Sequence, residues 1–155
     1  MRELFVLYLA PCLWSFLACV GFGLIFNIQG FGVAITGMGG ALGWMVYLLV
    51  MEWQGQDIFA AFVAAMSIAV YSEVMARVRK YPITAYLVVS YFPLVPGGFI
   101  YRAMYYGIQG ERQLFLETGI QTIGIAASIA VGTLLVSTIV RTYATWKRGR
   151  RMNCG

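Results

Sequence analysis

The sequence predicts an all-α integral membrane protein, a bundle of about five transmembrane helices of which the fourth is broken. Three observations support this prediction. Of the 155 residues, 61% are hydrophobic and 11% are charged, whereas soluble domains carry about 45–50% apolar and about 25% charged residues. The apolar residues form stretches of about 20, long enough to cross a hydrocarbon core of about 30 Å as helix. Finally, the proline- and glycine-rich segment Pro93–Gly98 interrupts one of these stretches.

The first expected span, Leu4–Phe26, ends at the polar residues Asn27 and Gln29. Its apolar run is longer than the roughly 7–15 residues of a signal-peptide core and lacks a convincing cleavage site, so we expect it to be retained. Cys12 and Cys19 lie in this span, about 10 Å apart along a helix, which is too far for a disulfide. We expect their thiols to fill space as small apolar groups.

The second expected span, Phe31–Met51, is apolar but contains five glycines, each of which costs a helix about 1 kcal/mol in water. In a membrane, small residues also allow helices to approach closely. A re-entrant segment that does not cross the membrane is the alternative for this part of the chain. The glycines are Gly32, Gly37, Gly39, Gly40 and Gly43.

Three further spans are expected, at Asp57–Met75, Thr84–Tyr106 and Gly119–Val140. The fourth of the five contains two prolines and two glycines at its middle, and the fifth leads into a basic segment. Because the connections are short, the sequence predicts one transmembrane domain over residues 1–140 and a basic cytoplasmic tail over residues 141–155.

Small residues recur every four positions in three of these spans, a pattern that brings membrane helices close together. Ordinary packing is the simplest interpretation of each pattern. Together, however, they suggest more close-packing surface than so small a bundle uses internally, and hence a neighbouring chain or a homo-oligomer. The small residues are Gly39 and Gly43, Ala60 and Ala64, and Gly124, Ser128 and Gly132.

Eight of the eleven Lys and Arg residues lie in two clusters, each just beyond an apolar stretch. Because Lys and Arg are enriched in cytoplasmic loops, this placement predicts a multi-pass protein of the cell membrane with a cytoplasmic C-terminus. The N-terminus lies outside with five spans and inside with four. The same placement argues against nucleic-acid binding despite the net charge of +5. The clusters are Arg77, Arg79, Lys80 and Arg141, Lys147, Arg148, Arg150, Arg151.

The interruption of the fourth span predicts two half-helices that meet near Pro96–Gly98. Pro96 lacks an N–H and clashes with the preceding turn, while Gly97 and Gly98 can adopt backbone angles closed to other residues. Non-helical backbone at membrane depth persists only when it is buried in protein or lines a wet cavity, and the N-terminus of a half-helix favours anions. Pro96, Gly97 and Gly98 are therefore candidate substrate-binding residues, with a structural kink as the alternative.

Three other polar residues are candidates for function. Arg102, one turn past the break, could hold a substrate carboxylate bidentately or extend to the membrane surface. Asn27 could line a polar path or simply stop a helix. Glu73 could take part in ion coupling if it is buried, or pair with Arg77 four residues later on the same helix face.

Neither enzymatic chemistry nor a cofactor is predicted. The chain has no histidine, and its three cysteines form no Cys-x-x-Cys motif, so a zinc or haem site is not expected. No Gly-x-Ser-x-Gly nucleophile motif occurs either.

The segment Pro93–Gly98, with the sequence PLVPGG, resembles the PxxPG signature in the smaller half of the threonine/serine exporter family (ThrE-type). Tyr101 and Met104–Tyr105, which follow it, fit the same signature. The resemblance covers most of residues 15–140 and leaves the C-terminal tail unmatched. Other segments that resemble this half are Val20–Asn27, Gly39–Gly43 and Ala76–Pro82.

This resemblance implies a secondary transporter that exports small polar metabolites, typically threonine and serine, or a dicarboxylate such as succinate in some split systems. In this family the two halves occur fused in one chain or as separate chains, and the present chain resembles only the smaller half. We therefore expect a subunit that acts on a small-molecule substrate together with the larger subunit of the same exporter, within the lipid bilayer. A subunit that only stabilises that partner is the alternative.

Overall fold

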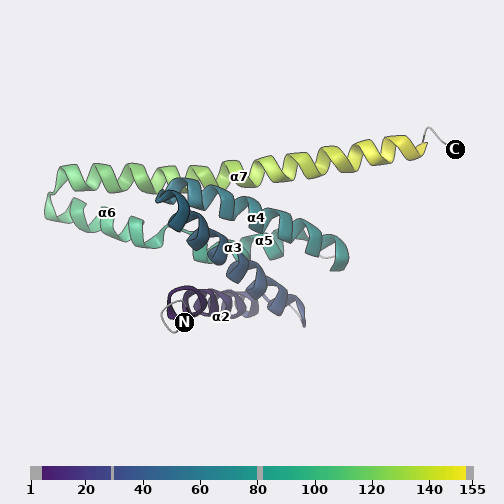
Figure 1. The fold of residues 1–155 in the computed structure, drawn as a ribbon, viewed down its shortest axis with the longest axis horizontal. Coiled ribbons are helices and arrows are strands. Elements are labelled where there is room, and N and C mark those ends of the chain that lie inside the picture. The colour runs from purple at the N-terminus through teal and green to yellow at the C-terminus, as the bar shows by residue number, and fades with distance from the viewer. Residues whose placement is uncertain (1–4, 29, 80–81, 153–155) are drawn as a thin grey trace.

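The computed structural model describes residues 5–28, 30–79 and 82–152, and these residues are helical almost throughout, with no strand among them (Figure 1). The predicted all-α fold is thus confirmed. Leu4, Arg2, Lys80 and Cys154 lie outside the described residues. The elements are the π-helix η1 (Phe5–Leu9), α2 (Ala10–Ile25), α3 (Gly32–Gln54), α4 (Asp57–Arg79), α5 (Ile83–Tyr91), the 3₁₀-helix η2 (Phe92–Leu94), α6 (Gly97–Gln109) and α7 (Arg112–Met152).

Among the described residues, three helices are long and apolar enough to cross a membrane: α3, α4 and the Arg112–Ala144 part of α7. Helix α5 with η2, taken together with α6, forms a fourth candidate that is bent by 50°. Despite its glycines, α3 is one continuous helix of 23 residues. Beyond Ala144, α7 continues as the same helix to Met152, so the predicted tail that starts at residue 141 is helical in its described part.

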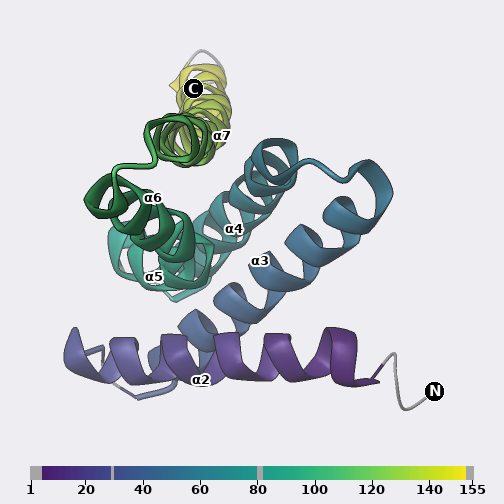
Figure 2. The ribbon, with the colours of Figure 1, turned by 90° about the vertical axis from the view of Figure 1, so that its left-hand side faces the viewer.

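The predicted first span divides into η1 and α2. Helix α2 has 16 residues, or about 24 Å of helix, which is less than a hydrocarbon core of about 30 Å. It is seen end-on in Figure 1 and lengthwise in Figure 2, whereas α7 shows the reverse, so the two helices run crosswise. The fully buried Cys19 of α2 lies against Gly40 of α3, which confirms that this thiol fills space between helices.

Helix α4 lies at the centre of the packed helices, between α3 and α7 (Figure 2). Its buried residues are mostly alanines, whose small side chains let the neighbouring helices approach. They are Ala60, Ala61, Ala64, Ala65, Ile68, Ala69, Ser72 and Ala76.

The expectation that the small-residue faces are left over for a neighbouring chain is wrong. A Cβ on Gly39 would overlap the Ser90 hydroxyl of α5, and one on Gly43 would overlap Ile68 of α4. On α7, a Cβ at Gly132 would lie 3.0 Å from the Phe62 carbonyl oxygen of α4. These faces are therefore used for helix contacts within the chain. Ala60 and Ala64 are fully buried, and a Cβ on Gly124 would overlap the Ile58 side chain.

The break in the fourth span confirms the two predicted half-helices. Helix α5 ends at Tyr91, a 3₁₀ turn follows, and Val95 is extended with φ −59° and ψ 127°. An extended residue is favoured here because the ring of Pro96 disfavours helical angles in the residue before it. Helix α6 begins at Gly97, so Gly97 and Gly98 lie in its first turn and the non-helical backbone is at Val95–Pro96.

Candidate functional site

A cavity of about 220 Å³ lies beside this break, between α3, α6 and α7. A water molecule occupies about 30 Å³ in the liquid, and pockets for drug-sized ligands begin at about 300 Å³. The cavity therefore has the size for a small molecule or a few waters. Its walls are Trp44 and Tyr47 of α3, Pro93–Pro96 of the break, Gly98 and Phe99 of α6, and Ile125 of α7.

Two of the predicted site residues, Pro96 and Gly98, line this cavity. Gly97 is their chain neighbour, and a Cβ added to Gly97 or Gly98 would meet nothing within 4 Å. Neither glycine has a positive φ, so neither packing nor backbone conformation requires glycine here. The first turn of an α-helix carries N–H groups without helical acceptors and favours negative charge. The glycines thus leave open space around a helix start that suits an anion.

Tyr47, which lines the cavity, belongs to a polar cluster with Asp57 and Gln121. The Tyr47 hydroxyl donates a hydrogen bond to Asp57 Oδ1 at 2.7 Å, and Gln121 Nε2 donates to Asp57 Oδ2 at 2.8 Å. Asp57 is the first residue of α4, where the helix dipole favours a carboxylate. One carboxylate therefore joins α3, α4 and α7 beside the break.

This cluster is not among the site residues predicted from the sequence. Gln121 was detectable as a polar residue inside the apolar stretch Gly119–Val140, and Asp57 as an acid at the start of a span. Their pairing depends on the contact between α4 and α7, two helices separated by a bent pair in the sequence. No local pattern indicates that contact.

Trp44 forms an aromatic wall of the cavity, and its Nε1–H is a hydrogen-bond donor without an acceptor among the described residues. Its ring stacks on Tyr47 with centroids 5.3 Å apart and an angle of 25° between planes. The Trp44 Nε1 atom is enclosed, and no acceptor among the described residues receives its hydrogen bond. An enclosed donor without an acceptor costs about 1–3 kcal/mol. A conformational change or a ligand that supplies an acceptor would recover this cost.

Arg102 is exposed on α6, and no hydrogen bond or ion pair joins it to another described residue. Helices α6 and α7 pack side by side in opposite directions (Figure 1), and Gly107 faces the Phe115 ring. Arg102 precedes Gly107 by five residues, so it lies at about the height of Gln121 and its cluster. The guanidinium therefore does not point into the packed core of this chain, and its exposure is compatible with an aqueous path, a partner or the membrane surface.

Asn27 ends helix α2. It has φ +55°, its N–H donates to Leu24 O, and the Ile28 N–H donates to Gly23 O, each at 3.0 Å. These two bonds define a Schellman motif, in which a left-handed residue closes the helix. Helix α3 begins just after this turn, and Trp44 lies about 18 Å further along it. The structure thus separates Asn27 from the cavity and gives it the geometry of a helix stop.

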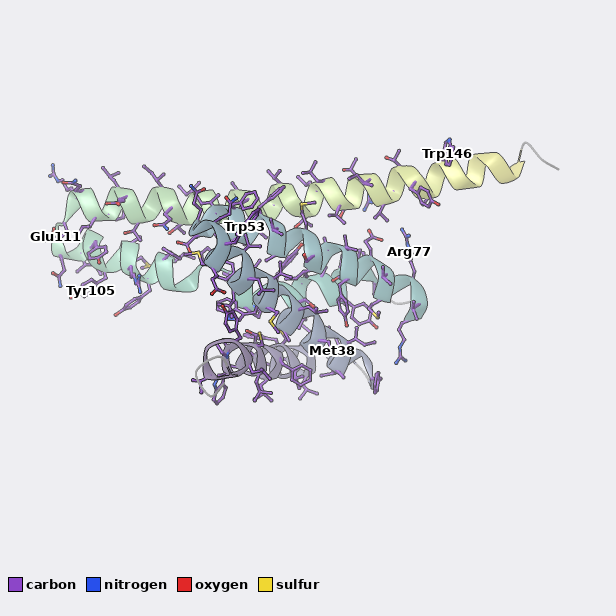
Figure 3. All side chains as sticks on the ribbon, viewed as in Figure 1. Met38, Trp53, Arg77, Tyr105, Glu111 and Trp146 are labelled. Carbon is purple, nitrogen blue, oxygen red and sulfur yellow. The ribbon has the colours of Figure 1, made fainter. Side chains whose placement is uncertain are left out.

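Glu73 pairs with Arg77 across one turn of α4, with 3.3 Å between Oε2 and the guanidinium. This ion pair is one of the two predicted alternatives, and the geometry confirms it. Glu73 is 14% exposed and Arg77 is 56% exposed. Glu73 lies about 24 Å along α4 from Asp57, towards the end that Arg77 marks in Figure 3 and away from the turn between α6 and α7 near Glu111.

Between the cavity and that end, hydroxyl groups lie in the contact of α3, α4 and α5. Ser90 donates to Thr36 O at 3.2 Å, and Tyr71 donates to Ile35 O at 3.0 Å. Ser90 and Thr36 are fully buried, as is Ser72, whose hydroxyl has no partner among the described residues. Helices α3, α4 and α5 are therefore in direct contact on this side of the molecule and their described residues leave no open path, although buried hydroxyl groups lie between them.

Residues 11–139, or 129 of the 155 residues, match the family described as Threonine/Serine exporter, ThrE. The matched segment contains the break, the walls of the cavity and the Asp57 cluster, and it ends before the basic tail. No curated protein and no solved structure matches the chain.

Proposed function

The chain belongs to the threonine/serine exporter family, and from this premise we propose that it is one subunit of a secondary transporter that works with a larger membrane partner. The family implies an exporter-type transport role in a membrane rather than enzymatic catalysis. The proposed substrates are small polar metabolites: threonine and serine, or a dicarboxylate such as succinate.

The observation that carries this proposal is the cavity beside the broken helix. Non-helical backbone inside a membrane is tolerated where it lines a cavity, and discontinuous helices form substrate sites in many secondary transporters. A subunit that only stabilised a partner would need neither the break nor the space beside it. This favours a transporting subunit over a scaffold.

Within this proposal, Pro96, Gly97 and Gly98 surround the substrate, and Arg102 receives a substrate carboxylate at the rim. The open space at the two glycines and the exposed guanidinium support these roles. Asn27 and Glu73 lie towards the opposite end of the packed helices. There Asn27, besides ending α2, would line the path, and Glu73, when not paired with Arg77, would serve as a coupling group.

A partner is supported by the arrangement of the α6–α7 hairpin, which extends beyond the other helices (Figure 1). Among the described residues, helix α6 packs mainly on α7 and shows large apolar side chains to its surroundings, among them Tyr101, Met104 and Ile108. The bilayer covers part of such a surface. We propose that the larger half of the exporter contacts the part of the α6 surface that the bilayer does not cover.

The test is efflux of L-threonine, L-serine and succinate from cells that carry both chains, either chain alone, or neither. We expect efflux of at least one of these compounds only with both chains present. Robust flux with this chain alone would refute the two-subunit arrangement, and no flux in any strain would refute the exporter role.

The proposed orientation places the C-terminus in the cytoplasm, because eight of the eleven basic residues follow spans on that side. A reporter that is active only in the cytoplasm, fused after Gly155, should be active. Activity of a reporter that works only outside would reverse the assignment.

A further inference from the structure

The direction of the hydrogen bonds at the Asp57 cluster determines what its neighbour Tyr47 offers to the cavity. An ionised carboxylate can only accept hydrogen bonds. Tyr47 must therefore donate its single hydroxyl proton to Asp57 Oδ1, 2.7 Å away. Gln121 donates to the other carboxylate oxygen and so holds Asp57 from the side of α7.

Tyr47 is itself one of the walls of the cavity. With its proton committed to Asp57, its oxygen retains lone pairs and acts as an acceptor. The neighbouring carboxylate makes this oxygen more negative because hydrogen bonds in a chain polarise one another. The Tyr47 hydroxyl therefore suits a hydrogen-bond donor on a ligand and offers no proton to a ligand carboxylate.

The ring faces of the aromatic wall have the same preference, whereas the Trp44 Nε1–H at the ring edge is a donor and suits an acceptor on the ligand. The stacked rings of Trp44 and Tyr47 carry negative charge on their faces, and such faces attract ammonium groups. None of the described residues that line the cavity is charged, so none of them places a lysine or arginine at that position. Arg102 is not among the walls and would meet the other end of a ligand.

We propose that Tyr47, positioned by Asp57, accepts a hydrogen bond from the ammonium group of the substrate and so selects amino acids over dicarboxylates at this site. This inference rests on the proposed transport function and goes beyond it, because it names the residue that distinguishes the two substrate classes. Tyr47 contacts the substrate in this scheme, whereas Asp57 and Gln121 are positioning residues.

The experiment uses the complete two-chain transporter in proteoliposomes and measures uptake of radiolabelled L-threonine. Unlabelled L-threonine competes in one series, and 2,3-dihydroxybutyrate, which replaces the ammonium by a hydroxyl, competes in the other. Tyr47→Phe removes the acceptor oxygen and keeps the ring. We expect it to weaken competition by L-threonine by roughly 10- to 100-fold, the range for a hydrogen bond to a charged group. Competition by the analogue should change by less than about threefold, because a neutral hydroxyl gains less from the same oxygen.

Asp57→Asn provides the second variant, because it keeps the shape of the side chain and removes the charge that fixes the Tyr47 proton. It should shift the preference between the two competitors in the same direction as Tyr47→Phe. The matched control is Tyr71→Phe, since the Tyr71 hydroxyl donates to Ile35 O and does not line the cavity. This control should affect both competitors equally.

Equal losses for the two competitors in Tyr47→Phe, or no loss for either, would overturn the assignment and leave Tyr47 as a helix contact. Tighter binding of succinate than of L-threonine by the unaltered transporter would overturn it as well. If the unaltered transporter moves none of these compounds, the proposed function itself fails and this inference falls with it.

Discussion

Glycines gather in two regions of this chain, on α3 and at the start of α6, and their surroundings are opposite. On α3, a Cβ at Gly37 would lie 2.7 Å from the Phe16 ring, and one at Gly40 would overlap the Cys19 thiol. At the start of α6, a Cβ on Gly97 or Gly98 would meet nothing within 4 Å. On α3 the missing side chain lets helices touch, whereas on α6 it leaves space beside a cavity.

This contrast divides the proposed path into a closed and an open part. Where α3 presents glycine to α2, α4 and α5, the helices are in direct contact and the hydroxyls between them are buried. Where α6 begins, the backbone is broken and a cavity remains. Alternating access requires that these two states exchange, so the glycine face of α3 is the contact that would have to separate for substrate to leave on the other side.

The largest expected effect is on stability, from Gly39→Ala. Its Cβ would overlap the Ser90 hydroxyl and lie 3.0 Å from the Tyr71 ring, and overpacking of this kind costs about 1–3 kcal/mol. Unfolding of the purified chain in detergent by increasing SDS should show this loss. Gly97→Ala is the matched control, because the same change in open space should alter stability by less than about 0.5 kcal/mol. Similar losses for the two variants would remove the contrast between the regions.

The next effect is on transport, from filling the cavity at Gly98. Gly98→Leu should reduce efflux by about tenfold or more, which corresponds to about 1.4 kcal/mol, because the side chain would occupy the space left for the substrate. Gly98→Ala serves as the control and should keep most of the activity, since its Cβ has room. Both variants should assemble with the partner at normal abundance. Full efflux from Gly98→Leu would favour the scaffold interpretation.

The sequence predicted the parts of the structure that depend on local chemistry. The broken span follows from Pro93 and Pro96, because proline affects the backbone wherever it lies. The ion pair of Glu73 and Arg77 follows from a spacing of four residues on one helix. A continuous helix at α3 was also predicted, although its five glycines made a re-entrant segment an alternative.

The parts that the sequence could not predict depend on which helices are neighbours. Asp57 meets Tyr47 ten residues away and Gln121 sixty-four residues away, and only the packed arrangement brings them together. The same limit explains the wrong expectation about the small-residue faces. A Gly-xxx-Gly pattern indicates close packing without showing whether its partner belongs to the same chain.

A smaller effect on transport is expected from Arg102→Lys. Lysine keeps the charge but loses the planar pair of donors that binds a carboxylate bidentately, so efflux should fall several-fold at normal membrane abundance. Arg112→Lys, at the exposed start of α7, is the matched control and should leave efflux unchanged. Unchanged efflux from Arg102→Ala would leave only the role at the membrane surface.

The smallest effect concerns a third reason for glycine, backbone conformation, at the turn after α2. Asn27 has φ +55° there, a conformation that glycine adopts without cost and alanine adopts at about 1–2 kcal/mol. Asn27→Gly should therefore change stability in the SDS titration by less than about 0.5 kcal/mol, whereas Asn27→Ala should lose about 1 kcal/mol. Because the turn is remote from the cavity, efflux should be unchanged in Asn27→Gly if the residue only stops the helix. A fall in efflux without a fall in stability would instead show that the Asn27 amide lines the path, and would extend the open part of the molecule to its opposite end.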